Sequence, residues 1–135
     1  MTINQISVFI ENKVGRLADM CRVLADAGVS LRALSISETA DFGIARLIVD
    51  DEGKTLNALR KAKYIVKSVP VVVVTVPDVP GGMSEVVATL SRGGCDIEYS
   101  YAGTLADGKA ALVFKFKDLA KALTAISDAG FATLG

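Results

Sequence analysis

One pattern of apolar residues occurs twice in this chain, in the same register. In each half, four apolar side chains at i, i+3, i+4 and i+7 mark one face of an amphipathic helix. These residues are Leu17, Met20, Cys21 and Leu24 in the first half and Met83, Val86, Val87 and Leu90 in the second. The sets lie 66 positions apart (83 − 17 = 66), and Gly15 with Gly81 and Gly28 with Gly94 follow the same interval. This repeat predicts two copies of one small domain, at residues 1–69 and 70–135.

The size and the apolar content of the chain favour association of these domains. The chain has 135 residues, of which 51% are hydrophobic. A domain of half this length has a marginal core when it stands alone, so we expect the copies to pack on each other or on a second chain. Oligomerisation is the simplest explanation of the apolar excess, and we therefore expect a homodimer.

The charges and the reactive residues argue against several classes of protein. With 15 basic and 15 acidic residues, the chain has no basic footprint for nucleic acid or an anionic membrane. It lacks histidine, the commonest general base and metal ligand, and its two cysteines are far apart. We therefore expect no catalysis, no metal and no cofactor. Since no leader or long apolar run is visible, we expect a cytoplasmic protein.

Periodicity and turn residues predict the order βαββαβ in each half. In the first half, strands are expected at residues 5–10, 30–37, 43–49 and 64–69, helices at 15–27 and 54–62, and a turn at 38–42. In the second half, strands are expected at 71–76, 96–102, 109–116 and 131–133, and helices at 82–92 and 118–129. This order is typical of an α+β, ferredoxin-like fold with an antiparallel sheet covered by two helices on one face.

Two pairs of segments resemble a known family. The sequences ENKVGRL at 11–17 and PDVPGGM at 77–83 are similar to the strand-to-helix turn of ACT domains, which carries Asn or Asp, then Pro-Gly, then an aliphatic residue. LADAGVSL at 24–31 and LSRGGCDI at 90–97 resemble the helix exit of that family. The resemblance covers nearly the whole chain and implies tandem ACT domains. It also implies a free-standing regulatory module that binds a free amino acid between paired domains and controls a separate metabolic enzyme or regulator.

The residues of these turns suit the two charged ends of an amino acid. The start of a helix offers unpaired N–H groups and a positive dipole end to a carboxylate. Gly15 and Gly81, extended by Gly82, would let a ligand approach the main chain closely. Asn12 and Asp78 occupy equivalent positions and would accept hydrogen bonds from the ammonium. Because Asp78 adds charge attraction, we expect the second turn to hold the ammonium more tightly.

Further ligand contacts are expected around the same turns. Arg16, which has Gly82 at the equivalent position, would bind a ligand carboxylate through two hydrogen bonds. The ligand side chain would lie against apolar residues of the turns and of a partner domain. Leu17 and Met83 are expected to contact the ligand side chain, opposite residues 35–37 or Tyr99 and Tyr101 of the partner domain. Val14 and Pro80 are further expected binding residues of the turns.

Simpler roles for these residues remain open. An Asn or Asp before a helix often caps it or shapes a turn, and proline is common at a helix start. Tyr99 and Tyr101, on one face of a strand, are typical of a core or an interface. The main alternative function is therefore a structural or protein-interaction module that assembles through its sheets without a ligand. RNA binding is disfavoured because the central strands carry valine and alanine where exposed aromatic residues are needed.

Overall fold

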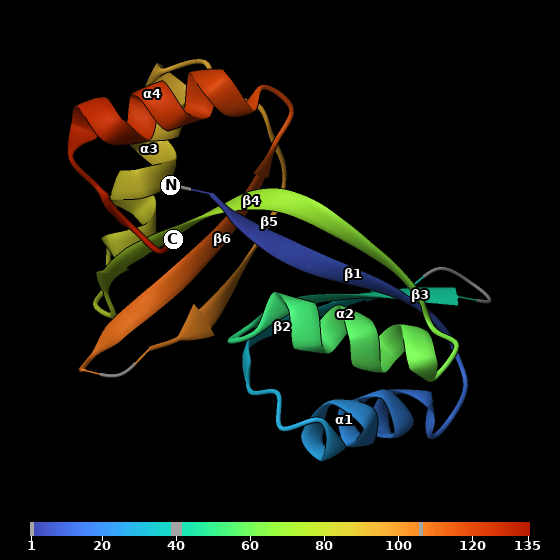
Figure 1. The fold of residues 1–135 in the computed structure, drawn as a ribbon. Coiled ribbons are helices and arrows are strands. Elements are labelled where there is room, and N and C mark those ends of the chain that lie inside the picture. The colour runs from blue at the N-terminus through green and yellow to red at the C-terminus, as the bar shows by residue number, and fades with distance from the viewer. Residues whose placement is uncertain (1, 39–41, 106) are drawn as a thin grey trace. The chain divides into compact units, whose positions relative to one another are not determined.

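The computed structural model describes residues 2–38, 42–105 and 107–135. These residues form two compact units (Figure 1). The N-terminal unit comprises Asn4–Val69, and the C-terminal unit comprises Pro70–Gly135 together with Thr2 and Ile3. Residues 39–41, within the turn expected at 38–42, lie outside the described residues.

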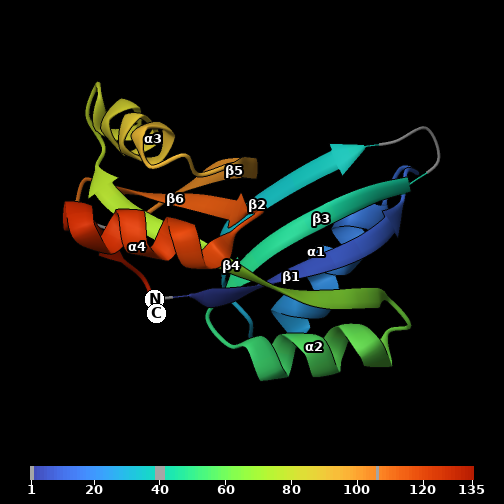
Figure 2. The same cartoon turned by 90° about the horizontal axis from the view of Figure 1, so that it is seen from above.

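The N-terminal unit has four strands and two helices in the order expected from the sequence. These elements are β1 (Ile3–Glu11), α1 (Arg16–Asp26), β2 (Leu31–Glu38), β3 (Phe42–Val49), α2 (Glu52–Lys61) and the first part of β4 (Ile65–Pro77). The strand order is β2-β3-β1-β4, and β3 pairs antiparallel with both β1 and β2. Figure 2 shows α1 and α2 on one side of this sheet.

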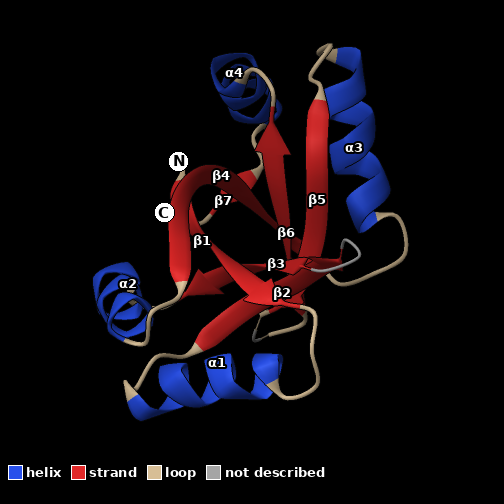
Figure 3. Cartoon of the chain, turned by 90° about the vertical axis from the view of Figure 1, so that its right-hand side faces the viewer, coloured by secondary structure: helices blue, strands red, loops and turns tan. Residues whose placement is uncertain are grey.

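The C-terminal unit repeats this arrangement. It contains the second part of β4, α3 (Gly82–Arg92), β5 (Ile97–Thr104), β6 (Lys109–Phe116), α4 (Leu119–Ala129) and β7 (Ala132–Thr133). Its strand order is β5-β6-β4-β7 (Figure 3). This is the order of the first unit, β2-β3-β1-β4, with β5, β6, β4 and β7 in the places of β2, β3, β1 and β4. The expected pair of ferredoxin-like α+β units with antiparallel sheets is thus confirmed. The short β7 matches the short last strand expected at 131–133.

The two strands expected at 64–69 and 71–76 are one continuous strand, which corrects the sequence-based prediction. β4 runs from Ile65 to Pro77 and passes through Pro70 without a break. Proline lacks only its own N–H, and its fixed φ is compatible with extended backbone, so an exposed proline need not end a strand. The valines from Val71 to Val74 are all buried, as expected for a central strand covered on both faces.

Each unit has its own core between its helices and one face of its sheet. In the N-terminal unit, Met20 and Leu24 of α1 and Leu59 of α2 pack on Ile6 and Val8 of β1. In the C-terminal unit, Val86 and Leu90 of α3 and Ile126 of α4 take the equivalent places against β4 and β6. The apolar stripes that mark the repeat are therefore core faces, as their helical spacing indicates.

The four helices begin and end with backbone features that recur between the units. Asp51 and Asp118 cap α2 and α4, accepting hydrogen bonds from the backbone N–H groups of Lys54 at 3.0 Å and Lys121 at 3.1 Å. α1, α3 and α4 are followed by glycines with positive φ, whereas α2 is followed by Lys63 at φ 72°. Only a residue that adopts left-handed backbone closes such a helix end, and glycine does so without steric cost.

Candidate functional site

The two strand-to-helix turns have almost the same backbone, and both are open to solvent. Gly15 and Gly81 stand at the N-caps of α1 and α3 in left-handed conformation, with φ of 91° and 90°, and as glycines they offer no side chain to cap either helix. A Cβ built on either glycine meets nothing within 4 Å. The Asp78 side chain accepts no hydrogen bond from the described part of the chain, so it does not cap α3.

A cavity of about 210 Å³ lies at the turn between β1 and α1. It brings together Asn12 and Leu17, two residues expected at a binding site, with Lys13 and Gly43. Ile36 of β2 closes it from the same unit. The sequence placed residues 35–37 in a partner domain and did not single out Ile36. The signal that points to it is a large apolar residue left 41% exposed on an edge strand.

Arg16 does not line this cavity and forms ion pairs within the chain. Its guanidinium is 3.7 Å from a carboxylate oxygen of Glu11 and 3.8 Å from one of Asp19. Lys13 also pairs with Glu11, at 3.1 Å, and this hydrogen bond, with the charges of Lys13 and Arg16, lowers the pKa of the Glu11 carboxyl below its ordinary value. Glu11 is therefore ionised at neutral pH. Val14, by contrast, is fully exposed and lines neither this cavity nor the one that Arg16 borders.

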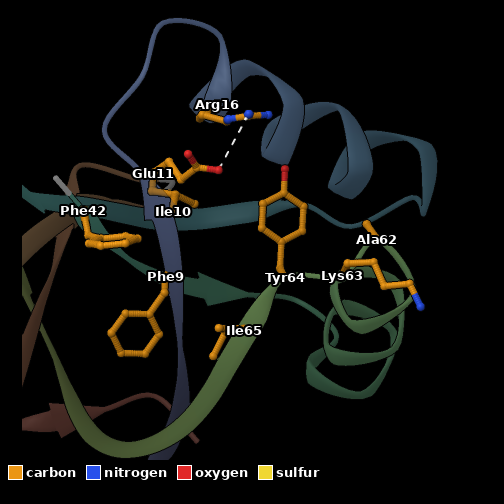
Figure 4. Close-up of a pocket in the computed structure, with 9 residues that line it drawn as sticks. All are labelled: Phe9, Ile10, Glu11, Arg16, Phe42, Ala62, Lys63, Tyr64 and Ile65. Carbon is orange, nitrogen blue, oxygen red and sulfur yellow. Dashed lines mark ion pairs between the residues drawn. The ribbon is translucent and has the colours of Figure 1, made fainter.

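Arg16 borders a larger cavity, of about 430 Å³, that sequence reasoning missed (Figure 4). Side chains from β1, the start of β3 and the segment that leads into β4 line it: Phe9, Ile10, Glu11, Phe42, Ala62, Lys63, Tyr64 and Ile65. Burial, and secondarily the charge of Asp19, raises the pKa of the Tyr64 hydroxyl, so the phenol stays neutral. Strand alternation alone could have suggested Phe9, because it lies on the opposite face of β1 from the core residues Val8 and Ile10.

The second turn presents its polar group to solvent. The Asp78 carboxylate is exposed and has no hydrogen-bond or ion-pair partner among the residues that the structure describes. Pro80 and Met83 are also exposed. Gly82 differs from Gly81, because a Cβ there would lie 2.8 Å from the carbonyl oxygen of Pro77. Gly82 therefore has a packing reason of its own, independent of any ligand.

The register of β5 and β6 decides which face of the sheet Tyr99 and Tyr101 occupy. Tyr101 pairs with Val113 across β5 and β6, whereas Ala102 pairs with the core residue Leu112. Since successive residues of a strand point to opposite faces, Tyr99 and Tyr101 are on the face away from α3 and α4. The residue of β5 equivalent to Ile36 is Ala102 (36 + 66 = 102).

The described residues give no indication of a metal site or of a membrane-spanning helix. In that part of the chain, no cluster of three or more His, Cys, Asp or Glu side chains has the arrangement of a metal site. None of the helices described there has the length and apolar character required to cross a bilayer. Cys21 and Cys95 are free and partly buried, each beside the core of its own unit.

Fold and turns together define a tandem pair of ferredoxin-like domains. A family model for the ACT domain pair matches residues 1–130, so the chain belongs to this family, as the sequence resemblance implied. The ACT domain pair is a regulatory module.

Solved structures agree with this assignment. Protein BT0572 from Bacteroides thetaiotaomicron is 36% identical, with a TM-score of 0.91 over 99% of this chain and 92% of that one. The regulatory subunit of aspartate kinase from Thermus thermophilus is 16% identical, with a TM-score of 0.65 over 96% and 95%. A C-terminal regulatory domain of aspartate kinase from Porphyromonas gingivalis is 14% identical, with a TM-score of 0.57 over 95% and 93%, and shares the fold. No curated protein is significantly similar in sequence.

Proposed function

We propose that this chain is a non-catalytic sensor that binds a free amino acid at its strand-to-helix turns and controls a separate enzyme or regulator. The observation that carries the proposal is the cavity of about 210 Å³ that Asn12 and Leu17 line at the start of α1. A carboxylate there would meet the positive end of the helix, and the side-chain oxygen of Asn12 would accept from the ammonium. The open space above Gly15 leaves the main chain accessible to such a ligand.

A homodimer would complete this site. Leu17 and Ile36 are both more than a third exposed, although they are large and apolar. An ACT domain of a second copy, placed against them, would bury these side chains and close the cavity around the ligand. Binding would then stabilise the dimer, and this linkage would carry the regulatory signal.

A thermal-shift series with each of the twenty amino acids tests the proposal. A specific ligand raises the melting temperature by an amount set by its concentration relative to its Kd. Asn12→Ala and Asp78→Ala should both reduce the ligand-induced shift of the melting temperature. We expect the larger reduction in Asp78→Ala, because the second turn should hold the ammonium more tightly. Asn57→Ala and Asp128→Ala, two exposed polar residues on helices, are the matched controls. Equal shifts in all four variants would refute the assignment of the ammonium.

A module that assembles through its sheets without a ligand is the second candidate function. The N-terminal unit exposes Phe9, Phe42 and Ile65, and 44 to 70% of each side chain remains accessible. Exposed apolar residues of this size are typical of interaction surfaces. A flat response to all twenty amino acids, together with a stable dimer, would favour this function over the sensor.

A further inference from the structure

The cavity of about 430 Å³ that Arg16 borders combines an apolar wall with one polar end. Phe9, Phe42 and Ile65 are 44%, 56% and 70% exposed, and all three border it. In Figure 4, Glu11 and Arg16 lie together at the α1 end, and the Lys63 side chain extends away from them. The volume of about 430 Å³ falls within the range of small-molecule sites, whereas the cavity at Asn12 lies below it.

The polar end has both a hydrogen-bond donor, on Arg16, and an acceptor, on Glu11, that a ligand can use. The contacts of Arg16 with Glu11 and Asp19, at 3.7 and 3.8 Å, are longer than hydrogen bonds, and its guanidinium has no hydrogen bond to the described part of the chain. On Glu11, Lys13 contacts Oε2 and leaves Oε1, the atom nearest Arg16, without a hydrogen bond to that part of the chain. The side chains of Glu11 and Arg16 are 47% and 45% exposed, so a ligand can reach both.

We propose that this cavity binds an amino acid with a large apolar side chain, whose ammonium lies on Glu11, whose carboxylate lies on Arg16, and whose side chain covers Phe9, Phe42 and Ile65. One acid and one base at the same end match the two charges of a zwitterion, and the apolar wall matches the rest of the molecule. A carboxylate can take two parallel hydrogen bonds from the guanidinium, which the long ion pair with Glu11 does not satisfy. This site adjoins the cavity at Asn12, with which it shares Ile10 and Glu11, and it does not require that cavity to be occupied.

Isothermal titration calorimetry of the full chain with L-phenylalanine, L-leucine and glycine tests the choice of ligand. Phenylalanine and leucine should bind at least about tenfold more tightly than glycine, because glycine leaves the apolar wall uncovered. Arg16→Gln should weaken phenylalanine binding about tenfold or more, in line with the loss of charged hydrogen bonds. Phenethylamine, which lacks the carboxylate, should bind weakly and with the same affinity to Arg16→Gln and to the unmodified chain.

Matched variants distinguish binding in this cavity from a general loss of charge or of apolar surface. Arg22→Gln changes another exposed arginine of α1, and Leu34→Ala removes an apolar side chain outside the cavity. Both should bind phenylalanine normally, whereas Phe9→Ala should not. Absence of phenylalanine binding, equal binding of glycine, or equal losses in Arg16→Gln and Arg22→Gln would overturn the proposal. So would a change of oligomeric mass in Phe9→Ala, which would mark the wall as a contact between copies. Amino-acid binding that Asn12→Ala abolishes and Arg16→Gln leaves intact would support the turn site and refute this one.

Discussion

Asp78 and Asp118 belong to the same unit, and each precedes a helix, yet we expect very different costs when they are replaced by alanine. The Asp118 side chain accepts a hydrogen bond from the backbone N–H of Lys121 at 3.1 Å and caps α4. Loss of such a cap costs about 1 kcal/mol of stability. The Asp78 carboxylate is exposed, and α3 begins after Gly81 without a side-chain cap. Asp78→Ala should therefore change the free energy of unfolding by less than about 0.5 kcal/mol.

Urea denaturation followed by circular dichroism measures both variants. With a urea m-value of about 2 kcal/mol/M, Asp118→Ala should lower the midpoint by about 0.5 M and Asp78→Ala by less than about 0.25 M. Asp51→Ala repeats the cap deletion in the other unit, where the bond to Lys54 is 3.0 Å long, and should behave as Asp118→Ala does. A loss in Asp78→Ala as large as in Asp118→Ala would show that Asp78 shapes the fold, and its exposure would then be no argument for a ligand.

Other consequences can be tested in the same way. Lys63→Gly should raise the melting temperature, and Gly130→Ala should lower it, because both residues follow a helix with φ above 70° and left-handed backbone costs a side chain about 1–2 kcal/mol. The pKa of Glu11 is lowered in the folded state, so its contribution to stability is present above the ordinary value of 4.5 and is lost as the pH falls through the lowered pKa. The stability difference between the unmodified chain and Glu11→Gln, measured by urea titrations from pH 7 to pH 2, should shrink accordingly; a constant difference would contradict this. Burial raises the pKa of the Tyr64 hydroxyl above its ordinary value of 10.0. In an absorbance titration, Tyr64→Phe should therefore remove a tyrosine component that titrates above pH 10.0. An unchanged titration in that range would contradict the raised pKa of Tyr64.

The elements of the fold follow closely from local sequence, because each depends on nearby residues. α3 was expected at 82–92 and runs from Gly82 to Arg92, since its apolar stripe and the glycines after it act locally. The strand boundary at Pro70 was wrong for the opposite reason. Whether a proline interrupts a strand depends on the hydrogen bonds that neighbouring strands require at that position, and this information lies elsewhere in the chain.

The candidate site was predictable only in part, because it depends on strand register. The repeat and the ACT resemblance pointed to the turns, where the structure places the cavity beside Asn12 and Leu17. Sequence spacing could not tell which face of β5 Tyr99 and Tyr101 occupy, since the pairing with β6 decides it. The larger cavity has the same origin, because Phe9 and Ile65 are distant in sequence and meet only once the strands are aligned.

The two glycines of the strand-to-helix turns offer a comparison in which one unit serves as the control for the other. Gly15 and Gly81 share nearly the same backbone, with φ of 91° and 90° and ψ of −15° and −12°, and neither would bring a Cβ within 4 Å of another atom. Alanine at either position should therefore cost stability for the same reason, left-handed backbone, and by the same amount of about 1–2 kcal/mol. Ligand affinity is under no such constraint, because only the first turn has Asn12 and the second has Asp78. Urea denaturation should therefore show equal losses of stability in Gly15→Ala and Gly81→Ala. Calorimetry of both variants with the same amino acid then identifies the occupied turn as the one whose variant loses more affinity. Stability losses that differ by more than about 0.5 kcal/mol would mean that something besides the backbone holds one of these glycines in place.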